Sequence, residues 1–138
     1  MPRQVSQVFV EQLGDWGVRQ VFGVVGETIL GLLSAIRSQE RVRFVAMQTE
    51  QAAAFAASAY GKLTGRLAAC IATGGPGTTG LMTGVYDAHS DRVPMLAITG
   101  QVRRAWQHEE AWQEIDDHAL FETASVYNTA TETPAQVP

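Results

Sequence analysis

The chain has 138 residues, of which 46% are hydrophobic and 17% are charged, so it is long enough for one domain with a buried core and too apolar to be disordered. With 10 basic and 14 acidic residues, a net charge of −4 and no run of Lys or Arg, it is an unsuitable partner for nucleic acid or an anionic membrane. No apolar stretch reaches the roughly 18 residues of a membrane span, no secretory signal opens the chain, and the lone Cys70 excludes an internal disulfide, so we expect a cytoplasmic protein.

Up to Gly100, short apolar runs alternate with longer segments in which apolar residues recur at helical spacing. The short runs indicate buried strands, and the longer segments indicate helices with one apolar face. In chain order, we predict helix 5–16, strand 21–25, helix 29–36, strand 42–47, helix 52–63, strand 67–73, helix 81–88 and strand 95–99. Buried strands joined by helices are typical of the α/β class, here three α/β/α layers with a mainly parallel sheet.

The chain changes character after Gly100. Residues 101–118 are rich in charged side chains, His, Trp and Gln, which predicts a polar loop with one short helix. We predict a helical turn at 119–124 and a short strand at 126–130. Thr133 and Pro134 are typical of a helix start, so we interpret residues 1–138 as one domain and a fragment of a longer chain, truncated before its last helix and strand.

A glycine-rich segment at 75–80 follows a predicted strand, opens a predicted helix and matches the pattern G-x-G-x-x-G. The pattern is found in dinucleotide-binding turns, where a helix N-terminus holds the pyrophosphate. The acidic companion expected near the end of the next strand is absent, since Thr99, Gly100 and Gln101 stand there. A glycine turn that lets backbone pass close to another group is the alternative, and the residues alone leave both open.

Glu50 follows the strand predicted at 42–47 and begins an alanine-rich helix. Open α/β sheets bind ligands at the carboxyl ends of their strands, which makes Glu50 a candidate functional acid. The simpler interpretation is a first-turn residue that the helix dipole favours. The alanines at 52–59 indicate either high helix propensity or a close protein contact such as a subunit interface, because small side chains let another helix approach.

The segment from His108 to His118 is rich in acidic residues and histidine, and it includes Glu114, Asp116 and Asp117. Their spacing matches no zinc pattern and includes no cysteine, so we predict a solvated acidic loop and assign no metal ligand to this chain. The sequence also lacks the G-x-S-x-G motif of a serine nucleophile.

A series of short segments stands in a fixed order along nearly the whole chain. They are Val21-Phe22-Gly23-Val24-Val25-Gly26, Thr49-Glu50-Gln51-Ala52-Ala53-Ala54, residues 59–65, Thr73-Gly74-Gly75-Pro76-Gly77-Thr78-Thr79, residues 87–94, Ile98-Thr99-Gly100-Gln101, Trp112-Gln113-Glu114 and Tyr127-Asn128. In this order they resemble the N-terminal pyrimidine-binding domain of thiamine diphosphate-dependent enzymes. Within that family the resemblance is greatest to the pyruvate oxidase and acetolactate synthase group.

The resemblance implies roles for individual residues. It places Glu50 on the family's catalytic glutamate, which activates the aminopyrimidine of the cofactor, and Gln113 on a catalytic-site glutamine that faces the substrate. The implied function is the pyrimidine-binding half of a decarboxylase, oxidase or carboligase that acts on 2-oxo acids. The residues implied to contact the cofactor are Val25, Gly26, Glu50, Thr73, Gly74 and Pro76.

Three positions depart from the family's pattern. Thr49 stands where His is frequent, Val25 stands where Pro is usual, and Glu27 stands where this group often has Gly. Glu27 is therefore either a second acid-base group or a first-turn helix residue, and we favour the second interpretation.

The resemblance also implies groups that this chain does not supply. In the family, a separate domain holds the diphosphate and Mg²⁺ through a Gly-Asp-Gly motif, which is absent here, so we expect the isolated chain to be inactive. The implied partners are thiamine diphosphate, a 2-oxo acid and the diphosphate-binding domain of the same or a neighbouring subunit in a homo-oligomer. FAD occurs in some relatives, in another domain. The alternative functions are a non-catalytic α/β binding or interaction module and a dinucleotide-binding domain.

Overall fold

The computed structural model describes residues 4–137. Its strands are β1 (Gln20–Gly23), β2 (Arg43–Ala46), β3 (Ala68–Ala72) and β4 (Met95–Thr99). Its helices are α1 (Val5–Asp15), α2 (Leu30–Arg37), α3 (Glu50–Thr64), α4 (Pro76–Ser90) and α5 (Asp117–Phe121), with the short 3-10 helices η1 (Glu27–Ile29), η2 (Arg104–Trp106) and η3 (Pro134–Gln136). Every helix and strand predicted up to residue 100 is present, with boundaries that differ by a few residues.

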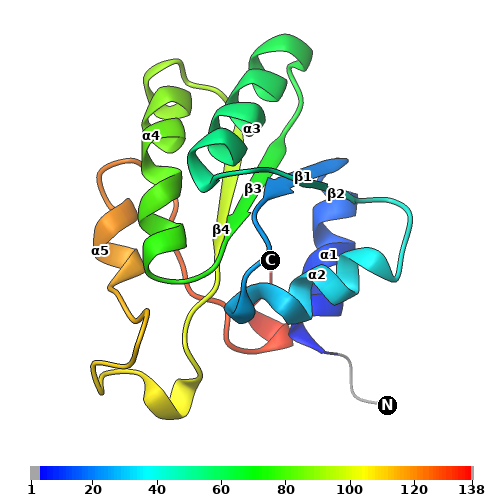
Figure 1. The fold of residues 1–138 in the computed structure, drawn as a ribbon. Coiled ribbons are helices and arrows are strands. Elements are labelled where there is room, and N and C mark those ends of the chain that lie inside the picture. The colour runs from blue at the N-terminus through cyan, green and yellow to red at the C-terminus, as the bar shows by residue number, and fades with distance from the viewer. Residues whose placement is uncertain (1–3, 138) are drawn as a thin grey trace.

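Over the described part of the chain, the strands form one parallel sheet in the order β2-β1-β3-β4. The register pairs Val21 of β1 with Phe44 on one side and with Ala69 on the other. Helices α1 and α2 cover one face of the sheet, and α3 and α4 cover the opposite face (Figure 1). The prediction of a three-layer α/β/α fold is therefore confirmed.

The central strand β3 is buried along its whole length and divides two hydrophobic cores. Ala68, Cys70 and Ala72 face the core beneath α3 and α4. Ala69 and Ile71 face the core beneath α1 and α2, as the alternation of side chains along a strand requires. Burial raises the pKa of the Cys70 thiol to about 12, so this cysteine is an inert core residue.

Small residues explain how closely α3 and α4 pack. A Cβ atom placed on Gly84 would lie 2.5 Å from the Cβ of Ala54 and 2.7 Å from its carbonyl carbon, so a larger residue would force the helices apart. One turn further along α4, Asp87 accepts a 2.6 Å hydrogen bond from buried Ser58 and a 2.8 Å one from Lys62. The alanine-rich stretch thus makes a close contact within this chain, and its use in a subunit interface stays a prediction.

The chain after Gly100 corrects one prediction, because residues 126–130 form no strand. The side chain of Val126 is fully exposed and that of Tyr127 is largely so. This segment and β4 line a cavity of about 2170 Å³, so the segment borders a gap beside the edge strand. A strand exists only where a neighbour exchanges hydrogen bonds with it. The helix start at Thr133 and Pro134 is present as η3.

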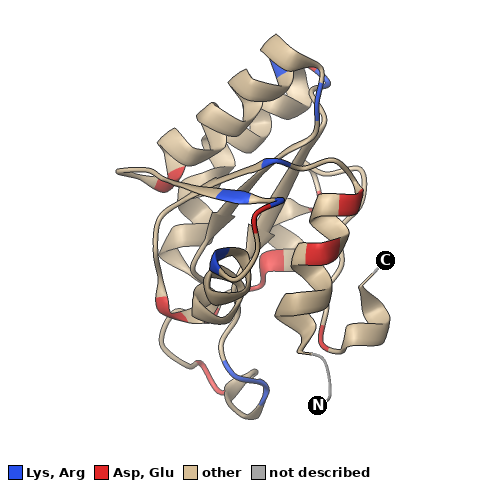
Figure 2. Ribbon diagram, turned by 90° about the vertical axis from the view of Figure 1, so that its right-hand side faces the viewer, with Lys and Arg blue, Asp and Glu red and all other residues tan. Residues whose placement is uncertain are grey.

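Charged side chains are dispersed over the fold. Figure 2 shows Lys and Arg on several separate elements and loops. One exposed ion pair, 2.6 Å between Arg41 and Asp15, joins the turn before β2 to the end of α1. Within residues 4–137, no helix combines the length and the apolar character that crossing a membrane requires.

Candidate functional site

The loops that follow the strands meet at the carboxyl edge of the sheet. Strand β1 lies between β2 and β3. The chain passes from β1 to β2 on one side of β1, and then crosses to β3 and β4 on the opposite side, so the strand order reverses at β1. Open parallel sheets bind ligands in the crevice at such a reversal of strand order. This topology predicts a binding site among the loops at 24–28, 47–49, 73–75 and 100–103.

Thr28 ties three of these loops together. The amide of Gly74 donates a 3.0 Å hydrogen bond to Thr28 Oγ1, and the hydroxyls of Thr28 and Thr73 form a 2.9 Å hydrogen bond. A side chain on Gly26 would clash with Thr73, and one on Gly100 would clash with Thr28. Thr28 was not identified from the sequence, although a hydroxyl two residues after Gly26, at the start of a helix, was the available signal.

The turn after β3 needs its glycines for packing within the chain. Gly75 has a φ of +66°, in the left-handed region that glycine adopts without strain. A Cβ atom placed on Gly74 would lie 2.7 Å from the carbonyl oxygen of Gly100. One placed on Gly75 would lie 2.7 Å from the carbonyl oxygen of Gln113. The space that side chains would occupy is thus filled by this chain's own backbone. The same contacts bring Gln113 to the glycine turn.

Glu50 is the first residue of α3 and lies against the first two turns of α4. Thr49 caps α3 by accepting a 3.2 Å hydrogen bond from a first-turn amide. A Cβ atom on Gly77 would lie 3.5 Å from Glu50 Oε1 and 2.9 Å from Thr73 Cγ2, and one on Gly80 would lie 3.0 Å from Glu50 Cβ. The glycines of α4 therefore make room for the half-buried Glu50 side chain beside Thr73.

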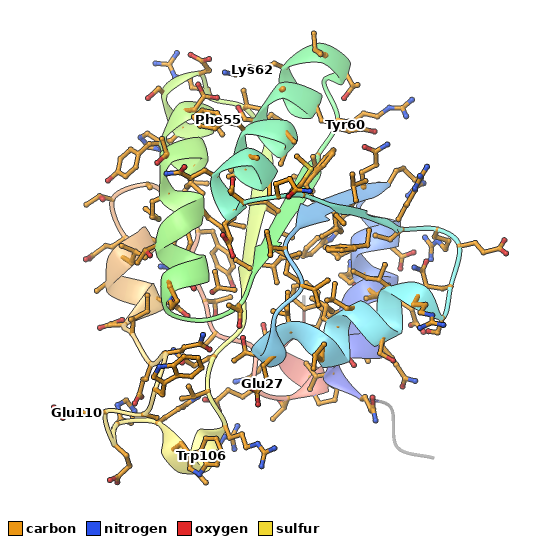
Figure 3. All side chains as sticks on the ribbon, in the orientation of Figure 1. Glu27, Phe55, Tyr60, Lys62, Trp106 and Glu110 are labelled. Atoms are coloured by element: carbon orange, nitrogen blue, oxygen red, sulfur yellow. The ribbon has the colours of Figure 1, made fainter. Side chains whose placement is uncertain are left out.

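The remaining candidate residues selected from the sequence differ in how far they are buried. Gln113 is half-buried, whereas Pro76, the first residue of α4, is exposed. Val25 is exposed over 61% of its surface. Glu27 is the exposed first residue of η1 (Figure 3), which agrees with the first-turn interpretation. The structure brings Gln113 close to the turn at Gly74 and leaves Val25 and Glu27 facing outward.

Asp117 differs from the solvated acid that the sequence predicted. Its Oδ2 accepts hydrogen bonds from Thr99 at 3.3 Å and from Gln101 at 3.5 Å. Its Oδ1 is buried, with no hydrogen-bond partner among the described residues. Burial is the main cause that raises the pKa of this carboxyl above its ordinary value. Asp117 therefore attaches the start of α5 to the end of β4.

Comparison with known proteins gives consistent results. The family model described as "Thiamine pyrophosphate enzyme, N-terminal TPP binding domain" matches residues 3–120. The chain is 37% identical over 133 residues to the acetolactate synthase large subunit of Corynebacterium glutamicum, which covers 96% of this chain and 21% of that protein. It is 32% identical over 130 residues to the pyruvate oxidase of Lactiplantibacillus plantarum, covering 94% of this chain and 22% of that protein.

A third relative extends the range of organisms. The acetolactate synthase large subunit of Pyropia yezoensis is 43% identical over 103 residues, covering 72% of this chain and 18% of that protein. The chain spans about a fifth of the length of these three relatives. The similarity therefore concerns one part of each of these longer proteins.

Proposed function

The chain belongs to the thiamine pyrophosphate enzymes, as their N-terminal TPP-binding domain, and on that premise we propose that it is the pyrimidine-binding half of an enzyme that acts on 2-oxo acids. The proposed reaction is a decarboxylation, an oxidation or a carboligation. The similarity to a pyruvate oxidase and to acetolactate synthases supports this choice of reactions.

The observation that carries the proposal is the position of Glu50. Its half-buried carboxyl group lies at the carboxyl edge of a parallel sheet, against glycines of α4 and beside Thr73. A carboxyl group partly withdrawn from water at this edge of the sheet suits the edge of a flat heterocycle that carries ring nitrogens. The residues present therefore fit the aminopyrimidine of thiamine diphosphate.

Each residue of the site has a separate part in the proposal. When bound, thiamine diphosphate supplies the carbon nucleophile and the electron sink for 2-oxo acid chemistry. Glu50 holds the proton at the pyrimidine nitrogen N1′, and the packing of α3 on α4 keeps its carboxyl in place. The turn at Thr73 and Gly74, tied to Thr28, forms one wall of the ring site together with Gly26, while Gln113 faces the 2-oxo acid.

The proposal gives the diphosphate and Mg²⁺ to another domain of the same or a neighbouring subunit. Within residues 4–137, no three His, Cys, Asp or Glu side chains lie close enough together to hold a metal ion. In this proposal the protein is a homo-oligomer, in which a neighbouring subunit can supply the second domain, and it is located in the cytoplasm. FAD, where the intact protein contains it, belongs to a further domain.

The test is Glu50→Gln in the intact protein, assayed with thiamine diphosphate, Mg²⁺ and pyruvate as the first 2-oxo acid. We expect turnover to fall by about a hundredfold or more, because an amide does not transfer the proton that a carboxylic acid does. Glu40→Gln, which removes the same charge from an exposed turn before β2, is the matched control and should keep its activity. Unchanged turnover in Glu50→Gln would favour a non-catalytic interaction module.

A further inference from the structure

The loop between β4 and α5 carries Gln113 without the support of regular secondary structure. Three of its residues other than glycine have φ angles in the left-handed region: His108 at +69°, Glu110 at +53° and Gln113 at +69°. Such angles cost free energy and persist only where surrounding contacts hold them. Figure 3 shows Trp106 and Glu110 on this loop, extending away from the sheet. Contacts with other groups therefore hold the loop in this conformation.

The carboxylate of Glu114 supplies such contacts. Its Oε1 accepts a 2.5 Å hydrogen bond from the amide of His108, and its Oε2 accepts a 3.1 Å hydrogen bond from the amide of Ala111. The amide of Glu114 itself donates to the carbonyl oxygen of Ala111 at 2.9 Å. The hydrogen bond from the amide of His108 is the main reason why the pKa of this carboxyl is below its ordinary value. One anion thus closes the segment 108–114 on itself.

Gln113 belongs to this closed segment and lies against the glycine turn. A Cβ atom on Gly75 would lie 2.7 Å from the carbonyl oxygen of Gln113 and 2.9 Å from its Cα. The backbone of Gln113 is therefore confined on one side by the turn, while its neighbour Glu114 is held on the other side by two amides. A displacement of Glu114 would shift Gln113 directly, because the two residues are adjacent in the chain.

We propose that Glu114 is a positioning residue, whose carboxylate accepts hydrogen bonds from the amides of His108 and Ala111 and so holds Gln113 against the glycine turn. The inference rests on the proposed function in one respect, which is that Gln113 faces the substrate. An acid that only solubilises the loop would point to water, whereas Glu114 directs both oxygens at backbone amides of its own loop. Charge-assisted hydrogen bonds to backbone amides are among the stronger ones in proteins.

The first test measures amide hydrogen exchange in the intact protein with Glu114→Gln. We expect the amides of His108 and Ala111 to exchange about tenfold faster, because the charged acceptor that protects them is lost. Glu110→Gln removes the same charge from the outer part of the same loop and should leave both rates unchanged. Equal rates in the wild-type protein and Glu114→Gln would overturn the inference.

The second test compares kcat/KM for pyruvate in Gln113→Ala, Glu114→Gln and the double variant, with thiamine diphosphate and Mg²⁺ present. If Glu114 acts through Gln113, each single change lowers kcat/KM by about tenfold and the double variant loses no more than Gln113→Ala alone. Losses that multiply would overturn the positioning role.

The outcomes also separate this inference from the proposed function. An inactive Glu50→Gln combined with a fully active Glu114→Gln leaves the proposed function in place and overturns the inference. An unchanged kcat/KM in Gln113→Ala removes the substrate role of Gln113, and with it the functional half of the inference. Faster exchange at His108 and Ala111 would still identify Glu114 as the residue that closes the loop.

Discussion

Glu50 and Gln113 lie at the same edge of the sheet but in regions that are built in different ways. Glu50 begins a helix whose inner face is buried against α4, where Gly84 and Ala54 let the two backbones come close. Gln113 lies in a loop with few buried side chains, held by hydrogen bonds from backbone amides to the carboxylate of Glu114. One region depends on side-chain volume, and the other depends on charge.

The difference separates stability from function. Burying apolar surface contributes about 25 cal/mol per Å², so the packed helices α3 and α4 carry much of the free energy of folding. Hydrogen bonds on an exposed loop contribute little to global stability, because water competes for the same groups. Changes to the buried residues of α3 and α4 should therefore lower the stability of the protein, whereas changes in the loop should alter the site and leave the fold intact.

The largest effect is expected for Gly84→Ala. The new methyl group would overlap Ala54 in both its side chain and its backbone, so the helices must move apart, and we expect a loss of about 2–3 kcal/mol in the free energy of unfolding. Gly31→Ala is the matched control, since no atom lies within 4 Å of the added group, and it should gain about 0.5 kcal/mol from helix propensity. Chemical denaturation measures both, and equal stabilities would refute the tight packing of α3 on α4.

A smaller loss, about 1 kcal/mol, is expected for Ser58→Ala, which removes a buried donor to Asp87. The hydrogen bonds from Lys62 and from Ser58 hold the pKa of Asp87 below its ordinary value of 3.8, and the bond from Lys62 has the larger effect. The pKa of Asp87 is lower in the folded state than in the unfolded state. The stabilisation is therefore complete when the pH is above the unfolded-state pKa, and it is lost as the pH falls through the folded-state pKa.

The pH dependence gives Ser58→Ala its own check. Denaturation midpoints at pH 6 should differ between the wild-type protein and Ser58→Ala, and the difference should shrink as the pH is lowered below the ordinary value of 3.8. Ser90→Ala, on the exposed last residue of α4, should show no loss at either pH. A difference that stays constant with pH would mean that the bond from Ser58 to Asp87 does not form in solution.

The smallest effect is expected for Trp112→Ala in the loop. This side chain is 81% exposed, so its removal should change the free energy of unfolding by less than about 0.5 kcal/mol despite its size. Thermal or chemical denaturation measures the change. A loss above about 1 kcal/mol would show that the loop is packed like the helices, and the contrast between the two regions would fail.

Much of the fold was predictable because the pattern of apolar residues reports burial directly. The strand 95–99 was predicted with its exact limits, and Glu50 was predicted to begin the helix that the structure shows as α3. The failure at 126–130 has a physical cause, since a short run that includes Val126 and Tyr127 suits a strand locally but lacks a neighbour to pair with.

The candidate site was predictable only in part. Glu50 was a candidate because it follows a predicted strand, the resemblance added Gln113, and the structure shows the backbone of Gln113 against the glycine turn. Thr28 was missed and Glu114 was taken for a solvated acid, because their contacts reach backbone amides that no spacing rule connects to them. Asp117 was also taken for a solvated acid, whereas burial at the end of β4 sets its character.

From the sequence alone came the alternation of strands and helices, the parallel sheet and the edge at which Glu50 lies, because periodic burial is written into the order of apolar residues. Only the tertiary structure decided which loops touch, that Gly84 admits Ala54, and that Glu114 closes a loop around Gln113. Those contacts join residues from separate segments, in part through backbone groups that every residue carries, so no sequence pattern specifies which residues meet.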